Sequence, residues 1–337
     1  MKRRRLTIFF VAALVLLTIL SGCNKGDSGK QLVRIGEVTR SLFYAPQYVA
    51  IEKGFFAEEG LQIDLTTTPG GDKTMTALLS NAIDVALVGS ETSIYVYLQG
   101  ADDKVINFAQ LTQTDGTFLV ARTEEEPFDW SNVAGTEFLG QRVGGMPQMV
   151  GEFVLKKHQI DPKLDLELIQ NVDYGNIPAA FASGTGDYVQ LFEPTASIFE
   201  REGTGKVVAS FGTESGLLPY TAFMARESYI TKNEAIIQSF TNAIYKAQQW
   251  IISADATEIA EVVTPYFDGV DADIMISSID RYKQQASYAE NPYIDELEWN
   301  NLLDVMSSAN ELKGDVQYGE IVNMKFAEQV LDEVSSK

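Results

Sequence analysis

The sequence has little of the chemistry that most enzymes need. Its 337 residues include one histidine, His158, and one cysteine, Cys23, so no His/Cys metal cluster and no Ser-His or Cys-His pair can form except through His158. His158 stands in the polar run Lys156-Lys157-His158-Gln159, which predicts an exposed, solvated side chain at a helix end. No P-loop and no Gly-x-Gly-x-x-Gly phosphate fingerprint is present. Hydrolysis by a pair of carboxylates stays open, because 47 acidic residues are available.

Positive charge is also scarce. The chain carries 26 Lys and Arg against 47 Asp and Glu, a formal net charge of −21. Such a surface repels nucleic acid and anionic lipid, so we expect no nucleic-acid partner. The charge argues mildly against anionic ligands as well, although a local pocket can override it. Beyond one apolar run near the start of the sequence, at residues 6–20, we find no second run of membrane-spanning length.

The first residues predict a secretory signal peptide at 1–22. Four basic residues at 2–5 precede an apolar run at 6–20, which is short for a membrane-spanning helix. The segment ends in Leu-Ser-Gly-Cys, which resembles the lipobox of bacterial lipoproteins, in which the cysteine is lipidated and becomes the mature N-terminus. This resemblance implies an extracytoplasmic protein with a lipid anchor at Cys23 and a flexible tether, within residues 23–32. The alternative is that Cys23 simply ends an ordinary signal peptide.

Removal of residues 1–22 leaves 22 basic and 47 acidic residues, a net charge near −25. The remaining 315 residues are enough for one large or two medium domains.

Alternating strand and helix patterns then predict an α/β fold with parallel-rich sheets covered by helices on both faces. In the first half we expect strands at 32–37, 61–67, 84–88, 107–111 and 118–121. The helices between them are expected at 46–53, at 73–80 with Asp72 as N-cap, and after Ser90 through Gln99. The acidic run 124–132 is interpreted as surface.

A second α/β unit follows, and then a helical tail. The strands of the second unit are expected at 141–144, 166–170, 188–192, 206–210 and 221–225, and its helices at 148–159, 177–183 and 194–202. In the tail, apolar residues recur at helical spacing from Ile236 to Ile251 and predict a stripe that faces the core. Further helices are expected at 257–266, 272–285, 296–309 and 319–334. Two such units and a helical tail indicate a bilobed protein.

At residues 33–61 the sequence VRIGEVTRSLFYAPQYVAIEKGFFAEEGL resembles the start of the solute-binding proteins of nitrate/sulfonate/taurine and thiamine-pyrimidine ABC importers. The Gly70-Gly71 pair, the segment AIDVALVG at 82–89 and Phe192-Glu193-Pro194 fit the same pattern, and the resemblance spans about residues 33–330. It implies a bilobed type II periplasmic-binding-protein fold, with a C-terminal helical extension on lobe one. Lobe one would hold 33–119 plus 224–337 and lobe two 120–223.

The family also implies partners. Its members bind a small molecule in the cleft between the lobes and deliver it to a membrane permease powered by an ATPase, and they work as monomers. We expect no cofactor, no metal and no catalytic residue. The chain departs from the pattern at 184–188, which reads Gly-Thr-Gly-Asp-Tyr where many members have Gly-Lys-x-Asp-Ala, and no basic residue except Arg40 is placed to grip an anion.

Ligands of such folds lie at the carboxyl ends of strands and the N-termini of helices. Arg40, Phe43 and Tyr44 follow the first strand, and the two aromatic rings could stack on a planar ligand or pack the lobe. Glu193, from the aromatic-Glu-Pro motif, is either a ligand group or a helix-start carboxylate, and Ser90 is either a contact or only an N-cap. The predicted ligand-binding residues are Arg40, Phe43, Tyr44, Gly70, Gly71, Ser90, Glu91, Thr92, Gln113, Gln148, Tyr174, Glu193 and Tyr220.

This set is rich in aromatic and acidic side chains, which suits a neutral or cationic nitrogen heterocycle such as a thiamine-pyrimidine precursor. Three alternatives remain open: a sulfonate-, taurine- or nitrate-binding protein of the same family, a pyrimidine-synthesising enzyme on this fold, and a ligand sensor.

Overall fold

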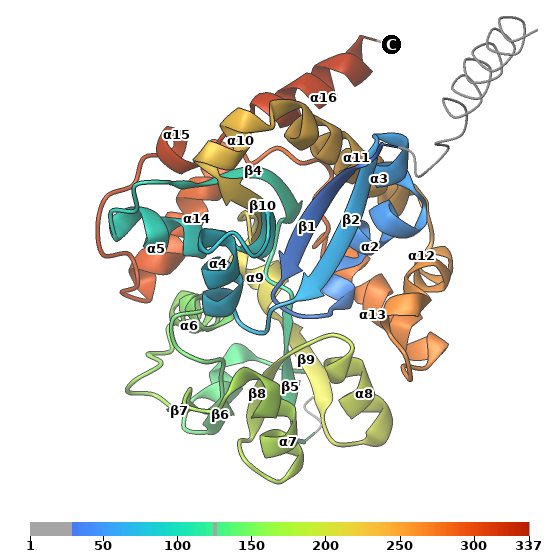
Figure 1. Ribbon diagram of the computed structural model, residues 1–337. Helices are drawn as coiled ribbons and strands as arrows, with labels where there is room; N and C mark the ends of the chain where they lie inside the picture. Colours follow the sequence, from blue (N-terminus) through green and yellow to red (C-terminus); the bar gives the residue numbers. More distant parts are fainter. Residues whose placement is uncertain (1–28, 124–126, 337) are drawn as a thin grey trace, which may run out of the picture. The chain divides into compact units, whose positions relative to one another are not determined.

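The computed structural model describes residues 29–123 and 127–336. Within these ranges, the compact unit Leu32–Lys337 is built on two five-stranded sheets (Figure 1). The strand order of the first sheet is β2-β1-β3-β10-β4, and that of the second is β7-β6-β8-β5-β9. The strands are β1 (Gln31–Glu37), β2 (Leu61–Thr67), β3 (Val85–Gly89), β4 (Val105–Thr112), β5 (Thr117–Ala121), β6 (Glu137–Leu139), β7 (Glu167–Ile169), β8 (Tyr188–Phe192), β9 (Lys206–Ser210) and β10 (Thr221–Arg226).

Helices pack around both sheets, so the predicted α/β class is correct. Those of the first part are η1 (Leu42–Tyr44), α2 (Ala45–Glu52), α3 (Phe55–Glu58), α4 (Gly71–Leu79) and α5 (Glu91–Leu98). Those among the strands of the second sheet are η2 (Trp130–Val133), α6 (Met146–Lys157), η3 (Tyr174–Asn176), α7 (Ile177–Ala182), α8 (Thr195–Glu202) and α9 (Phe211–Ser215). The tail forms α10 (Glu227–Lys232), α11 (Glu234–Ser253), α12 (Ala256–Val263), η4 (Thr264–Tyr266), α13 (Ala272–Gln284), α14 (Glu296–Ser308), α15 (Tyr318–Ile321) and α16 (Lys325–Ser335).

Each sheet combines parallel and antiparallel pairs. β1 and β3 are parallel, whereas β10 runs antiparallel to both β3 and β4. In the second sheet β6 is parallel to β7 and β8, and β5 is antiparallel to β8 and β9. β3, β4, β5 and β10 are buried over nearly their whole length, as expected for strands covered on both faces.

The chain passes between the two sheets twice, after β4 and after β9. The first connection is short and polar but buried: the Asp115 carboxylate accepts a hydrogen bond of 2.6 Å from the amide of Thr117, and Gln113 donates to the carbonyl of Ala286 at 3.0 Å. Burial raises the pKa of Asp115 to about 6. The lobe limits given above stay a prediction.

Several local predictions are wrong. The strand expected at 141–144 is three residues long and lies earlier, at β6, so residues 141–144 form a loop. The helix expected at 319–334 is interrupted, because Val322 adopts extended backbone and forms a bridge with Asn107 of β4. Neither Asp72 nor Ser90 caps a helix with its side chain, and α4 begins after Gly70, whose φ is 108°.

His158 is not solvated as predicted. Its imidazole stacks on Trp130, with ring centroids 4.8 Å apart, and its Nε2 lies 2.9 Å from a carboxylate oxygen of Glu214. Both partners are distant in sequence and could not be read from the local run of polar residues. The N-terminal predictions, including lipidation of Cys23 and most of the tether, fall at residues 1–28 and lie outside the described residues.

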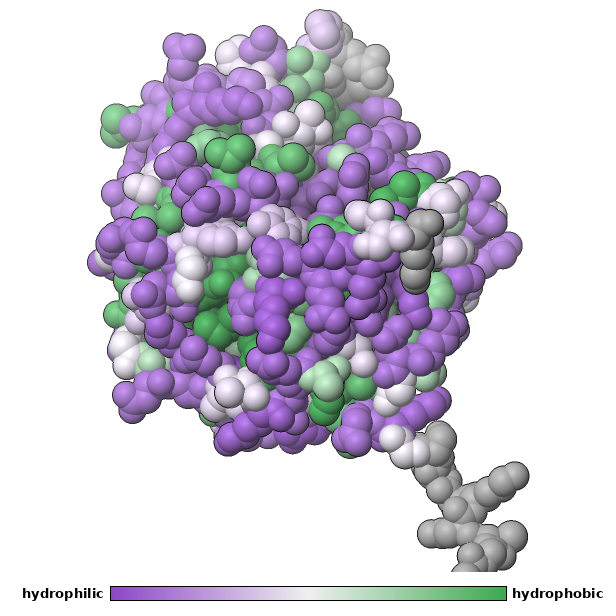
Figure 2. Space-filling model, turned by 90° about the horizontal axis from the view of Figure 1, so that it is seen from above, coloured by the Kyte–Doolittle hydropathy of each residue, from purple (hydrophilic) through white to green (hydrophobic). Residues whose placement is uncertain are grey.

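The side of the molecule seen in Figure 2 is covered mostly by hydrophilic residues, and the hydrophobic residues on it stand in small groups. In the described parts of the chain, no helix is both long and apolar enough to span a membrane.

The core beneath β4 and β10 is organised by α11. Its Phe240 is fully buried, and the ring lies 4.9 Å from those of Phe56 and Phe223 and 5.6 Å from that of Phe108. The buried stripe is slightly rotated from the predicted one, since Ile237 is buried and Ile236 is only half-buried.

We expect Phe240→Ala to lower the free energy of unfolding by about 3–5 kcal/mol, because the lost ring leaves a cavity among three aromatic neighbours. Urea denaturation measures this loss. Ile252→Ala on the same helix is the control: Ile252 is exposed, and its loss costs about 0.5 kcal/mol or less. Equal losses in the two variants contradict this account of the core.

Candidate functional site

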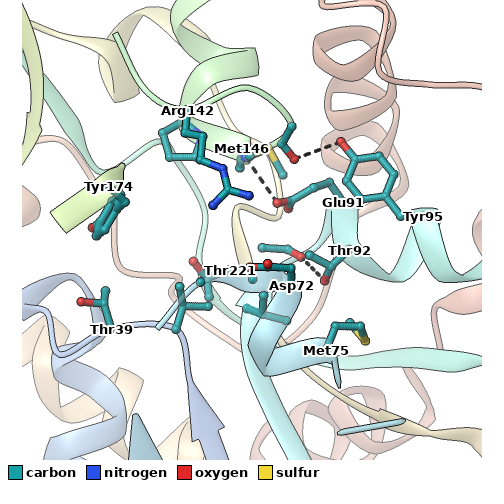
Figure 3. A pocket seen from close by; sticks show the side chains of 18 of the residues that line it. Thr39, Asp72, Met75, Glu91, Thr92, Tyr95, Arg142, Met146, Tyr174 and Thr221 are labelled. Carbon is teal, nitrogen blue, oxygen red and sulfur yellow. Dashed lines mark hydrogen bonds between the residues drawn. The ribbon is translucent and has the colours of Figure 1, made fainter. Parts of the chain in front are cut away.

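A cavity of about 490 Å³ lies where loops of the two sheets meet. One side is formed by residues that follow β1 and β2, by the end of β3 and by the first turns of α4 and α5. The other side is formed by the loop at 141–147, which runs into the first turn of α6, and by Tyr174 and Phe192. Tyr220 comes from the second connection between the sheets, and Thr221 is the first residue of β10. Figure 3 shows Arg142, Met146, Tyr174 and Thr221 around the cavity. The volume is in the range of small-molecule sites.

Phe43 anchors an aromatic wall. Its ring lies 5.9 Å from that of Tyr44, 6.0 Å from that of Phe192 and 5.5 Å, edge on, from that of Tyr220. Tyr174 stands at the rim, 6.2 Å from Phe192. The wall therefore joins rings from both sides of the cavity and offers faces and edges to a flat ligand.

Glu91 is the buried carboxyl group of the site. It begins α5, is 5% exposed, and its Oε1 accepts a hydrogen bond of 3.3 Å from the amide of Met146, at the start of α6. Its Oε2 has no hydrogen-bond partner on another described residue. Burial raises the pKa of Glu91 to about 7, against the opposing effect of its backbone hydrogen bonds. The side chain folds over Gly89, where a Cβ would lie 2.1 Å from Oε2.

The loop at 141–147 is hydrogen-bonded to α5 at two points (Figure 3). The amide of Met146 donates to Glu91, and the carbonyl of Gly144 accepts a hydrogen bond of 3.3 Å from the Tyr95 hydroxyl. Gln148 accepts a hydrogen bond of 3.0 Å from the Gly144 amide. The loop is therefore held over the cavity by main-chain atoms.

Arg142, on this loop, is a pocket residue that the sequence did not reveal. It is exposed, forms no ion pair or side-chain hydrogen bond with any described residue, and points its guanidinium into the cavity on the side of Glu91 (Figure 3). The misplaced strand at 141–144 hid it. With the strand ending at Leu139, Arg142 would have fallen in the loop before a helix, where ligand contacts are expected.

Eight of the predicted residues line the cavity together. They are Phe43, Tyr44, Gly70, Gly71, Glu91, Thr92, Tyr174 and Tyr220. Their role in ligand binding stays a prediction. Asp72 and Met75 of α4, Val143 of the loop and Thr221 line it as well and were not predicted.

Arg40 lies elsewhere. Its Nε pairs with the Glu37 carboxylate at 3.1 Å, and its guanidinium lies over the rings of Tyr48 and Tyr266. Glu37 also accepts hydrogen bonds from Gln47 and Tyr48, and burial raises its pKa. Arg40 therefore balances a buried carboxylate and does not line the cavity.

Glu193 also lies outside the cavity. Its carboxylate accepts hydrogen bonds of 2.9 Å from the amide and the hydroxyl of Ser197 and pairs with Arg281 of α13 at 2.7 Å. Its position ties the start of α8 to the helical tail. The physical reason is burial: a carboxylate enclosed here needs a cation and amide donors.

The three remaining predicted residues do not line the cavity. Ser90 is fully buried below the pocket surface, Gln113 lies in the first connection between the sheets, and Gln148 holds the loop and donates to Glu152 at 2.6 Å. Within residues 29–123 and 127–336, no group of three or more His, Cys, Asp or Glu could hold a metal ion.

The sequence matches the NMT1-like family over residues 26–264. It is 56% identical to the "Putative binding protein YtlA" of Bacillus subtilis strain 168, over 98% of both chains. It is also 27% identical to the formylaminopyrimidine-binding protein of Halalkalibacterium halodurans, over 61% of both chains.

Solved structures share the fold. A Bordetella bronchiseptica RB50 protein matches with a TM-score of 0.73 and 22% identity, covering 92% of this chain and 100% of its own. The nitrate-binding protein NrtA of Synechocystis PCC 6803 matches with a TM-score of 0.72 and 14% identity, covering 93% and 91%. The alkanesulfonate-binding protein SsuA of Xanthomonas axonopodis pv. citri, bound to MOPS, matches with a TM-score of 0.69 and 15% identity, covering 88% and 100%. These likenesses confirm the predicted periplasmic-binding-protein fold.

We expect Glu193→Ala to lower the free energy of unfolding by about 3 kcal/mol, because Arg281 loses its most buried partner. Urea denaturation measures the loss, and ligand affinity should not change, since the carboxylate is outside the cavity. Adding Arg281→Met to the same protein should recover part of the stability. A fall in affinity with no loss of stability contradicts this placement.

Glu91 predicts a pH dependence of stability. Its folded pKa of about 7 exceeds the ordinary 4.5, so between these values the folded state keeps a proton that the unfolded state loses. The unfolding free energy therefore falls as pH rises from about 4.5 to 7, by about 3 kcal/mol in total.

Glu91→Gln should remove this fall. Urea unfolding at pH 5 and pH 8 measures the free energy of unfolding of variant and parent. Relative to the parent, the variant should be more stable at pH 8 than at pH 5. Glu202→Gln, at an exposed carboxylate, is the control and should show no such change. A pH-independent difference for Glu91→Gln contradicts the buried proton.

Proposed function

Because the chain belongs to the NMT1-like family, we propose that it is the solute-binding protein of an ABC importer. The observation that carries the proposal is the cavity of about 490 Å³ between the two sheets, lined from both sides by aromatic and polar side chains. Relatives and structural neighbours whose names state a bound solute support it. We propose further that the mature protein is monomeric, extracytoplasmic and anchored through lipid at Cys23, and that it is not an enzyme.

The proposed ligand is a neutral or cationic nitrogen heterocycle, such as a thiamine-pyrimidine precursor. The wall around Phe43 supplies aromatic surface for a flat ring. The carboxyl groups of Asp72 and Glu91 line the same cavity and can accept hydrogen bonds from ring or amino N–H groups. The name of the formylaminopyrimidine-binding relative supports this choice.

Binding would favour a closed state of the protein. A ligand that touches Tyr44 or Asp72 on one side and Arg142 or Tyr174 on the other gains contacts only when the two sides approach. Such a ligand shifts the population toward the closed form, which the permease would recognise.

Arg142 favours a second candidate, a sulfonate, taurine or nitrate. A guanidinium with no described partner can form charge-assisted hydrogen bonds to an anion in the cavity. Against this candidate stand the two carboxyl groups nearby, which repel an anion when ionised.

The ligand class is tested by thermal unfolding of the protein lacking residues 1–23, in the presence of single compounds. We use aminopyrimidines, thiamine, other heterocyclic amines, taurine, alkanesulfonates, nitrate and bicarbonate. A ligand at about 100 times its dissociation constant adds about 2.7 kcal/mol, a rise of a few degrees in Tm. A shift with anions alone overturns the heterocycle and keeps the transport proposal. No shift with any compound, in a folded protein, counts against both candidate ligand classes.

Two matched variants separate the candidates by titration calorimetry. If the ligand is a heterocycle that donates N–H groups, Asp72→Asn should weaken binding about tenfold or more and Arg142→Gln should weaken it less. For an anion the order is reversed, since Arg142 would supply the attraction. The reversed order with an aminopyrimidine contradicts the proposed pose.

A further inference from the structure

The cavity does not end at the aromatic wall but continues between two helices. On α4 the lining residues Gly71, Met75 and Leu79 are four residues apart, and on α5 Thr92 and Val96 show the same spacing. Such residues lie on one face of a helix. At a rise of 1.5 Å per residue, the eight steps along α4 make a groove about 12 Å long, leading away from the strand ends.

The far part of this groove is mainly apolar, although Gln99 at the C-terminal end of α5 lines it too. Met75 and Val96 are almost fully buried along it, whereas Leu79 and Val143 are 42% and 55% exposed. Single exposed apolar side chains are common on protein surfaces, but these two line one cavity together with buried apolar neighbours, as apolar side chains at ligand sites do. The hydroxyl of Thr76, which also lines this part, is already bonded to the carbonyl of Asp72 at 2.7 Å.

The charged side chains lie at the near part. Asp72 and Glu91 stand in the first turns of α4 and α5, and Arg142 points in beside Glu91 (Figure 3). The groove therefore carries its charged side chains where it meets the aromatic wall and is mainly apolar beyond. Its roof is the loop at 141–147, which Tyr95 and Glu91 hold in place.

We propose that the ligand is elongated: its ring lies against the wall around Phe43, and an unbranched apolar arm of several carbons runs between α4 and α5 beneath Val143. This inference rests on the function proposed above and adds to it the shape of the ligand. The arm covers Leu79 and Val143, the two exposed apolar side chains of the groove. Its continuity with the ring site distinguishes this groove from exposed apolar residues elsewhere on the surface.

The test is a homologous series of 4-aminopyrimidines carrying methyl, propyl or hexyl groups at carbon 5, titrated by calorimetry into the protein lacking residues 1–23. Burial of each methylene should raise affinity about three- to fourfold. Leu79→Gln combined with Val143→Gln should reduce the gain per methylene. Leu164→Gln combined with Leu297→Gln, at apolar positions that are more exposed and lie outside the cavity, should keep it.

The outcomes separate the two proposals. Binding of the methyl compound with no gain for propyl and hexyl overturns the elongated ligand and leaves the importer function standing. A gain that persists undiminished in the Leu79/Val143 variant overturns the groove as the place of the arm. No binding by any compound of the series contradicts the heterocycle proposed above, and with it the ring site from which the arm was argued.

Discussion

The ring of Phe43 is the contact on which the site depends. It packs against Tyr44 beside it, against Phe192 at the end of β8 and against Tyr220 and Tyr282, so it touches structure from both sheets and from the helical tail. The first connection between the sheets must pass close by, and only glycine fits there: a Cβ on Gly116 would lie 2.8 Å from the ring. One buried aromatic side chain thus fixes both the wall of the cavity and the path of the chain between the sheets.

Four buried carboxyl groups, those of Glu37, Glu91, Asp115 and Glu193, differ in how fully their oxygens are hydrogen-bonded. Glu37 and Glu193 each have a guanidinium and several hydrogen-bond donors, and so act as braces. Asp115 is held by its neighbour Thr117. Asp115 and Glu91 each keep one oxygen without a hydrogen-bond partner on another described residue, but of the four carboxyl groups Glu91 alone lines the cavity. Incomplete satisfaction of a buried polar group is costly in a core and is common where a ligand binds.

The sequence was most informative where structure is local. The predicted strands 61–67, 188–192 and 206–210 coincide with β2, β8 and β9. Alternating or continuous apolar runs mark these strands, and turn residues mark their ends. The three-residue β6 has no such pattern, and its misplacement concealed Arg142. Glu193 was predicted to bind ligand from the aromatic-Glu-Pro motif, with a helix-start carboxylate as the alternative. The structure favours the alternative, since its partner Arg281 lies 88 residues away and no local sequence pattern reports an ion pair of that span. Most of the pocket residues could be predicted because they follow strand ends. Which acidic side chains face the cavity could not, because that depends on ion pairs between residues far apart in the sequence.

The loop at 141–147 is held by its backbone: Tyr95 binds the carbonyl of Gly144 and Glu91 binds the amide of Met146. Side chains at 142 and 143 take no part in that attachment. Mutation can therefore replace Arg142 and Val143 while the loop keeps its position over the cavity. The hydrogen bonds that position the loop are thus independent of the two side chains that it presents to the cavity, so the lining of the cavity can change there at little cost to folding.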